Sequence, residues 1–171
     1  SGIKVKWYDA DYSKIELAPP DHEIYGDAQC RRTIDQDRVV RYTERFDDGE
    51  PLQYPCIDIE FPEHGFRVRV VGNHRGLAKA ASKNSFGKYL LVRAEGFSYE
   101  LRRAFVRLAA NSSNVEDRLH AEPDSRDDIV TQLSNAWGAI QNVDLSKPKN
   151  YQHPLLKGDY LWKEKFTNAS S

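Results

Sequence analysis

The feature that most constrains the fold is a pair of short segments, near the middle of the chain, in which apolar and polar residues alternate. Residues 55–61 read PCIDIEF, residues 66–71 read FRVRVV, and Glu63-His64-Gly65 lies between them. A period of two places the apolar side chains of each segment on one face of a strand. The segments therefore predict a β-hairpin with one buried face and one face in water.

Helical patterns flank this hairpin. Asp35 is positioned to cap a helix that ends at Asp47-Asp48-Gly49. Its apolar residues recur at 3.6-residue spacing; they are Val39, Val40, Tyr42, Thr43 and Phe46. Residues 77–83 are rich in Ala and Lys, which predicts a second helix that Gly87 ends.

Residues 99–110 form a third amphipathic pattern, with Leu101, Phe105, Leu108 and Ala109 inward and Arg102, Arg103 and Arg107 outward. Ser125 is placed to cap a fourth helix, since Asp127 and Asp128 follow in its first turn. Its expected buried stripe is Ile129, Leu133, Ala136 and Trp137.

Further strands are expected at residues 3–8, 14–17 and 89–93, where branched or alternating residues occur. Strands and helices mixed in this order predict an α+β domain over residues 1–143. Residues 144–171 are polar and interrupted by Pro, with aromatic anchors between Tyr151 and Phe166. We expect an extended C-terminal tail that either covers the domain or docks on a protein partner.

The composition of the chain fits one globular domain. It has 171 residues, 39% of them hydrophobic and 30% charged, which is enough for a packed core. Its apolar runs fall far short of the roughly 20 residues that a membrane span needs, so no membrane partner is expected. Cys30 and Cys56 lack the spacing of a metal site. They could form one disulfide, but we expect two reduced thiols in a cytoplasmic protein. The Ser1-Gly2 start indicates either a remnant of an expression tag or a trimmed N-terminus.

The net charge of −1 hides an asymmetry along the chain. Residues 67–107 contain ten basic residues and two acidic ones. If they fold into one face, their potential would attract phosphates and DNA without sequence preference, with Arg102, Arg103 and Arg107 on one side of a helix. The alternative is ordinary solvated charge.

A Gly-Asn-His-Arg sequence follows the second strand of the hairpin directly. Gly72 lets the backbone approach a ligand closely, and the helix that starts next offers unpaired N–H groups to an anion. Arg75 can bind phosphate oxygens with two N–H groups, and His74 can donate a hydrogen bond or move a proton near neutral pH. This turn predicts a phosphate site.

The pattern VVRYTERFDDGEPLQYPCIDIEF, then FRVRVVGNHRGLAKA, resembles the N-terminal domain of the ParB/sulfiredoxin superfamily. The resemblance runs from about Ile15 to Trp137, and LAANSSNVEDRLHAEPDSRDDI supports it. It implies an α+β fold whose mixed sheet is flanked by helices and which binds a nucleoside triphosphate, ATP or CTP, with Mg²⁺. Gly72, Asn73, His74 and Arg75 would then surround the phosphates, with Arg32 and Asn111 as further contacts.

Several positions of this sequence differ from the family pattern, and these differences exclude some of the family's activities. Sulfiredoxins carry Cys where Asn73 stands, and segregation proteins carry a DNA-reading module for which the chain after Trp137 has no room. Val71 replaces an acidic residue of many relatives, so the metal ligand or general base stays open among Glu23, Glu44 and Asp48. Small plasmid proteins with ATPase and nuclease activity, which inhibit conjugal transfer, resemble this chain best in size.

Two function classes remain. The first is an enzyme that hydrolyses a nucleoside triphosphate, cleaves DNA, or does both, with His74 and Arg75 as its catalytic residues. The second is a noncatalytic module that binds a nucleotide or a protein and acts through its tail.

Overall fold

The computed structural model describes residues 2–19, 21–25, 34–51, 54–110, 127–141, 145 and 156–165. In chain order, the elements are β1 (Gly2–Asp11), η1 (Tyr12–Lys14), η2 (Glu23–Tyr25), α1 (Gln36–Asp47), β2 (Ile57–Phe61), β3 (Phe66–Val71), α2 (Asn73–Ala81), β4 (Phe86–Glu95), α3 (Tyr99–Ala110), α5 (Asp127–Gln141) and β5 (Leu156–Lys165).

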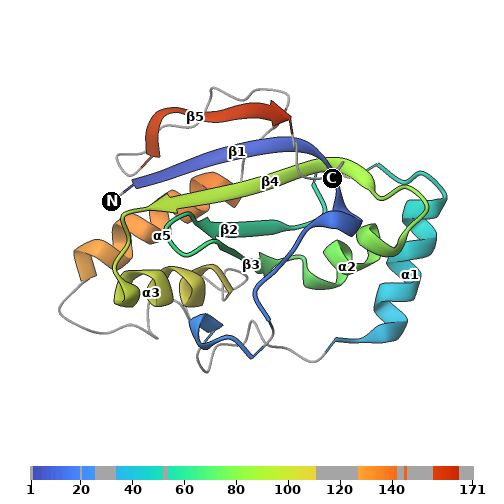
Figure 1. The fold of residues 1–171 in the computed structure, drawn as a ribbon, viewed down its shortest axis with the longest axis horizontal. Helices are drawn as coiled ribbons and strands as arrows, with labels where there is room; N and C mark the ends of the chain where they lie inside the picture. The colour runs from blue at the N-terminus through green and yellow to red at the C-terminus, as the bar shows by residue number, and fades with distance from the viewer. Residues whose placement is uncertain are drawn as a thin grey trace.

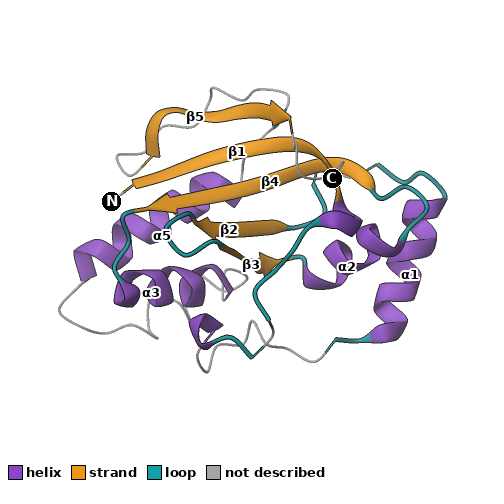
Figure 2. Cartoon of the chain, viewed as in Figure 1, coloured by secondary structure: helices purple, strands orange, loops and turns teal. Residues whose placement is uncertain are grey.

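Five strands form one mixed sheet in the order β3-β2-β4-β1-β5, with helices beside it (Figure 1). β2 pairs antiparallel with β3, as the hairpin prediction requires, and parallel with β4. β1 pairs antiparallel with β4 and parallel with β5. The expected α+β class with a mixed sheet flanked by helices is therefore confirmed (Figure 2).

One face of the sheet carries the main hydrophobic core, to which α3 and α5 contribute. Ile57, Ile59 and Phe61 of β2 are buried there, as the alternation predicts. Trp137 of α5 packs edge-on against Phe105 of α3, with ring centroids 5.7 Å apart. None of the helices in the described ranges has the length and apolar character that a membrane crossing requires.

The other face carries a smaller cluster, composed of Ala10, Tyr12, Cys56, Tyr89 and Leu91, with Ala80 of α2 packed against it. α2 thus covers the end of this face, and α1 lies beside α2 (Figure 1). Phe46 is the buried residue of α1, and the ammonium of Lys79 lies 5.2 Å from its ring centroid.

The predicted boundaries of α1 are confirmed. Asp35 is the N-cap, and its carboxylate accepts a hydrogen bond of 3.2 Å from the Arg38 N–H. At the other end, Gly49 has a φ of +84°, the left-handed conformation that ends many helices. The expected apolar stripe is wrong at Val40, which is 54% exposed, because α1 packs mainly against α2 on one side.

The strand predicted at residues 14–17 is wrong. The Asp11 carboxylate accepts hydrogen bonds from the Ser13 N–H and hydroxyl, and this local turn converts Tyr12–Lys14 into a 3-10 helix. The second helix is also displaced: α2 begins at Asn73 and ends at Ala81, and Gly87 lies within β4.

Residues 156–165, which the sequence analysis assigns to the tail, form β5 at the edge of the sheet. Their register with β1 shifts once, between Ile3 and Val5 of β1. Ser125, the expected cap of α5, lies outside the described residues. Within the described part of α5, the predicted burial of Leu133, Ala136 and Trp137 is confirmed.

Gly72, between β3 and α2, lies against the backbone that leads into β2. Its φ of +76° is left-handed, and a Cβ there would lie 2.3 Å from the Pro55 carbonyl oxygen and 2.9 Å from the Cys56 Cα. Both the dihedral angle and the space therefore require glycine.

We expect Gly72→Ala to lower the free energy of unfolding by about 3 kcal/mol, because it combines a left-handed alanine with a backbone clash. Denaturant unfolding measures this change. The matched control is Gly138→Ala in α5, where a Cβ meets nothing within 4 Å. That substitution should stabilise the protein by about 0.5–1 kcal/mol. If Gly72→Ala and Gly138→Ala change the stability equally, glycine is not required at position 72.

Candidate functional site

The Gly-Asn-His-Arg sequence forms the start of α2. Gly72 is the N-cap and offers no side chain to the first turn, and the first intrahelical hydrogen bond runs from the Gly76 N–H to the Gly72 carbonyl at 2.7 Å. The N–H groups of residues 73–75 precede this bond and have no carbonyl partner within the helix. Their partial positive charge makes this turn attractive to an anion.

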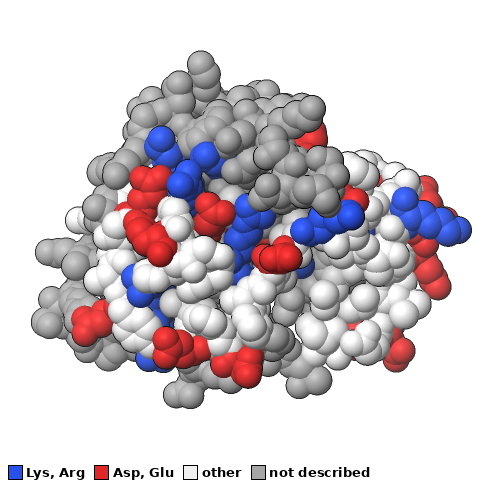
Figure 3. All heavy atoms as spheres, in the orientation of Figure 1, with Lys and Arg blue, Asp and Glu red and all other residues white. Residues whose placement is uncertain are grey.

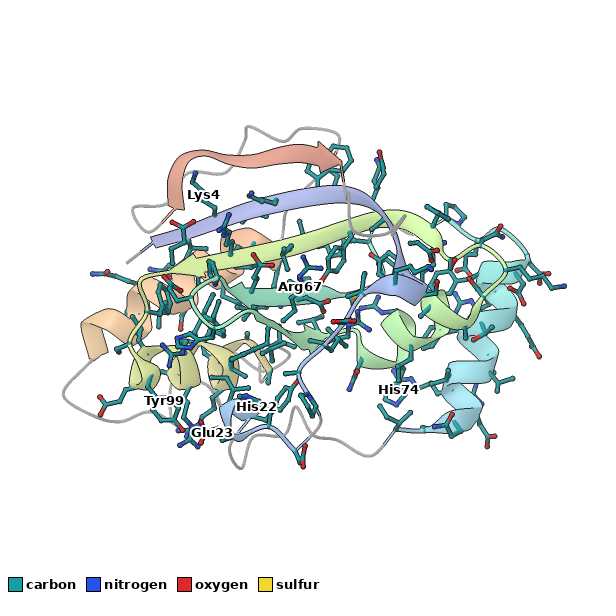
Figure 4. All side chains as sticks on the ribbon, viewed as in Figure 1. Lys4, His22, Glu23, Arg67, His74 and Tyr99 are labelled. Carbon is teal, nitrogen blue, oxygen red and sulfur yellow. The ribbon has the colours of Figure 1, made fainter. Side chains whose placement is uncertain are left out.

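His74 points from α2 toward the N-terminal end of α1 (Figure 4). Its Nε2 accepts a hydrogen bond of 3.0 Å from the backbone N–H of Asp35. Nε2 therefore acts as the acceptor in this contact, and Nδ1 is the ring nitrogen left for a donor N–H. His74 thereby ties the first turn of α2 to the N-cap of α1.

Arg75 lines a pocket of about 180 Å³ together with Tyr42, Arg45, Phe46 and Glu50. Arg45 and Glu50 form a two-bond ion pair. The hydrogen bond from Arg45 lowers the pKa of Glu50, so this carboxylate is ionised at neutral pH. Within the described part of the chain, the guanidinium of Arg75 forms neither a hydrogen bond nor an ion pair.

The structure thus brings Gly72, Asn73, His74 and Arg75 to one helical turn, but His74 and Arg75 contact different parts of α1. Successive helical residues point about 100° apart, which explains the divergence. Arg32 and Asn111, the two other predicted phosphate contacts, lie outside the described residues. Glu50, which the sequence analysis did not select, is the acidic residue of the pocket.

A buried polar network lies beneath α2, on the hairpin face whose alternating polar residues predict contact with water. Asp58 is fully buried and Arg69 is 6% exposed. The Arg69 Nε and Nη2 donate to the two carboxylate oxygens of Asp58 at 2.9 and 3.2 Å, and the Tyr89 hydroxyl donates to the second oxygen at 2.5 Å. The expectation of water on this face is wrong because α2 covers it.

Burial and charge set the protonation of this network. Burial disfavours the charged guanidinium of Arg69, but the Asp58 carboxylate more than offsets it and the pKa of Arg69 is raised. Burial, and then the Asp58 charge, raises the pKa of Tyr89 and of the Cys56 thiol. Cys56 and Tyr89 therefore stay neutral beside the Asp58–Arg69 ion pair.

One sequence signal indicates this network. Asp58 and Arg69 occupy directly paired positions of the hairpin, so their opposite charges meet across the strands. A second signal is the spacing of Gly72 and Gly76, four residues apart on one face of α2. A Cβ at Gly76 would lie 2.5 Å from the Arg69 Nη1.

Three of the ten basic residues in segment 67–107 are paired with carboxylates and so add no free positive charge to a face. Arg67 pairs with Glu60, Arg93 lies near Glu60 and Glu95, and Arg69 is buried. Arg67 lies over the middle of the sheet, whereas Tyr99 marks α3 at its side (Figure 4). On the face in Figure 3, Lys and Arg lie among Asp and Glu.

One arginine of α3, Arg102, differs from its expected outward orientation, whereas Arg107 is exposed as expected. Arg102 turns back, and its Nη1 donates to the Phe97 carbonyl at 2.7 Å. The guanidiniums of Arg102 and Arg103 both lie within 6 Å of the Tyr99 ring centroid, at 5.6 and 5.8 Å.

Among the described residues, no group of three or more His, Cys, Asp or Glu side chains is arranged to hold a metal ion. Glu23 lies in η2, whereas Glu44 and Asp48 lie on α1 and after it. None of these three lines the Arg75 pocket.

Comparison of the chain with models of protein families, with curated proteins and with solved structures gives no match. The resemblance to the ParB/sulfiredoxin superfamily therefore stays a prediction from the sequence.

We expect His74→Ala to loosen the start of α1, because the Asp35 N–H loses its acceptor. A hydrogen bond contributes about 1 kcal/mol, so the Asp35 amide should exchange its hydrogen about fivefold faster. Amide hydrogen exchange followed by NMR measures this rate. The control is His64→Ala, in the exposed β2–β3 turn. If exchange at Asp35 is unchanged in His74→Ala, His74 does not hold the start of α1.

Proposed function

We propose that this protein binds a nucleoside phosphate at the first turn of α2. The observation that carries the proposal is the guanidinium of Arg75, which pairs with none of the described residues and lines a pocket next to α1. Arg75 belongs to the first turn of α2, whose N–H groups at residues 73–75 have no carbonyl partner within the helix. A helix N-terminus and an arginine together supply backbone donors and a two-pronged cation, the combination that phosphate oxygens prefer.

The size of the pocket limits what it holds. Its 180 Å³ is below the roughly 300–1,000 Å³ of sites that enclose whole ligands. It suits a phosphoryl group or another part of the nucleotide, whose remainder lies outside. The rings of Tyr42 and Phe46 offer apolar surface to that part of the ligand.

The ligand in this proposal is a nucleoside triphosphate, ATP or CTP with Mg²⁺, as the resemblance to the ParB/sulfiredoxin superfamily implies. Hydrolysis of the triphosphate is the favoured activity. The Nδ1–H of His74 is free of the bond to Asp35 and is available to donate to a phosphoryl oxygen. Both oxygens of Glu50 accept from Arg45, which lowers the pKa of this carboxyl, so Glu50 is a weak base for water and the general base stays unassigned.

DNA cleavage and the inhibition of conjugal DNA transfer belong to the same proposal, on the resemblance alone. The alternative is a noncatalytic module that binds the nucleotide and acts on a protein partner through residues 144–171. Phosphate release separates the two: an enzyme releases phosphate from ATP or CTP at a rate that depends on Arg75, whereas a module binds without turnover.

We expect Arg75→Ala to weaken binding of ATP or CTP by about 10- to 100-fold, because hydrogen bonds to charged groups contribute about 1.5–3 kcal/mol. Calorimetric titration measures the affinity, and denaturant unfolding checks that the fold is retained. The matched control is Arg41→Ala, an exposed α1 residue outside the pocket. Wild-type affinity in Arg75→Ala would reject the site.

For DNA, we expect sequence-independent binding that falls steeply with salt, since each phosphate contact releases counterions with a slope of about −0.9. Arg102 is bonded to Phe97, so Arg103→Gln with Arg107→Gln should flatten the slope by about two units. Fluorescence anisotropy on a short duplex and a single strand measures it, with Lys14→Gln and Arg41→Gln as the control pair. If the protein binds neither DNA at low salt, the proposed activity on DNA is rejected, whereas the proposed nucleotide binding is unaffected.

A further inference from the structure

We infer that single-stranded nucleic acid binds along α1, on a strip formed by Arg38, Tyr42 and Arg45 of α1 and by Arg75 of α2. In this complex one base stacks on the Tyr42 ring. The inference rests on the proposed function, because the phosphate site at Arg75 is one end of the strip. It adds a binding surface at the side of the sheet opposite α3 (Figure 1).

Tyr42 is the centre of the strip. The guanidinium carbons of Arg38 and Arg45 lie 5.9 and 5.6 Å from its ring centroid. The three residues are spaced four and three positions apart, so they lie on one side of α1. Tyr42 also lines the pocket that Arg75 lines. It therefore connects this pocket with the guanidinium of Arg38.

The strip carries positive charge that no described carboxylate neutralises. Arg38 is exposed, and its guanidinium, like that of Arg75, forms no ion pair with a described residue. Arg45 pairs with Glu50, so it contributes a planar group and no free charge. The Asp35 carboxylate near Arg38 caps the helix. Arg38 and Arg75 are therefore the two cations of the strip that are open to an anion.

The acidic residues of α1 lie on another side of the helix. Asp37 and Glu44 are about 140° and 160° around the helix from Tyr42, at 3.6 residues per turn. Arg41 lies four residues after Asp37 and three before Glu44, so it shares their side. A solvated helix face mixes both signs of charge, as the side of Arg41 does. The side of Arg38 instead combines arginine with an aromatic ring.

This combination matches the chemistry of a single strand. In such a strand phosphates alternate with bases, and proteins bind it with cationic groups and with aromatic rings or guanidinium planes on which bases stack. A phosphate at Arg75, a base on Tyr42 and the next phosphate at Arg38 follow this order.

Other ligands use only part of the strip. A mononucleotide has no second phosphate for Arg38. In a duplex the bases stay paired and stacked, so none is available to Tyr42. An acidic peptide matches the charges but offers no base to the ring. The strip therefore favours a single-stranded oligonucleotide over these three ligands.

The first test measures binding of an oligothymidylate of about six nucleotides to the full chain by fluorescence anisotropy. We expect Tyr42→Leu to weaken binding about tenfold, because it removes the surface on which one base stacks. Tyr42→Phe keeps the ring and should bind like the wild type. Wild-type affinity in a folded Tyr42→Leu, or an equal loss in Tyr42→Phe, would overturn the inference. Denaturant unfolding checks the fold.

A second variant keeps the inference testable if Tyr42→Leu does not fold. Arg38→Gln changes an exposed side chain, and it should flatten the salt dependence of oligothymidylate binding by about 0.7 units, the value for one phosphate contact of a single strand. The matched control is Arg41→Gln, which removes the same charge from the same helix on the side of Asp37 and Glu44. An equal change in both variants would indicate general charge attraction and would overturn the inference.

Inorganic triphosphate separates this inference from the proposed function. It needs only the Arg75 end of the strip, so Tyr42→Leu and Arg38→Gln should bind it like the wild type, and it should displace oligothymidylate. If the wild-type chain binds triphosphate but no oligothymidylate at low salt, the inference fails and the proposed function stands. If it binds neither, both fail.

An oligoglutamate of the same length serves as the acidic peptide. It should not displace oligothymidylate, because it has no bases for Tyr42. Displacement at equal concentration would overturn the inference and indicate an acidic protein as the ligand of the strip.

Discussion

The structure depends on the close approach of α2 to the β2–β3 hairpin. Gly72 meets the backbone of Pro55 and Cys56, and Gly76 meets the guanidinium of Arg69. A helix with side chains at these positions would stand farther from the sheet, because packed interiors leave no room for an added methyl group. The separation of α2 from the sheet decides which hairpin residues are buried and where Arg75 lies relative to α1.

Local patterns predicted the elements that depend on local physics. The period-two segments gave β2 and β3, the Asp35 cap gave the start of α1, and the amphipathic spacing gave α3. Each of these signals operates within a few residues of the chain. The strand at residues 14–17 was wrong for the same reason, since the hydroxyl and N–H of Ser13 bind Asp11 and outweigh the alternation.

The buried network could not be predicted from alternation alone. A charged residue at every second position indicates a wet face, unless another element covers that face. Whether α2 covers the hairpin depends on Gly72 and Gly76 and on the pairing of Asp58 with Arg69. These are tertiary contacts, which the pattern within one segment does not show. The same applies to the basic segment, whose excess charge in the sequence is offset in space by Glu60 and Asp58 from β2.

The sequence predicted that residues 72–75 form a turn at the start of a helix, but it did not predict the directions in which His74 and Arg75 point. The sequence places His74 and Arg75 side by side, whereas the helix turns one toward Asp35 and the other toward Tyr42, Phe46 and Glu50. Both residues therefore contact α1, one at its N-cap and one along its C-terminal half. An anion held by Arg75 would lie against the helix that His74 anchors, so movement of α1 relative to α2 would change the site from both ends.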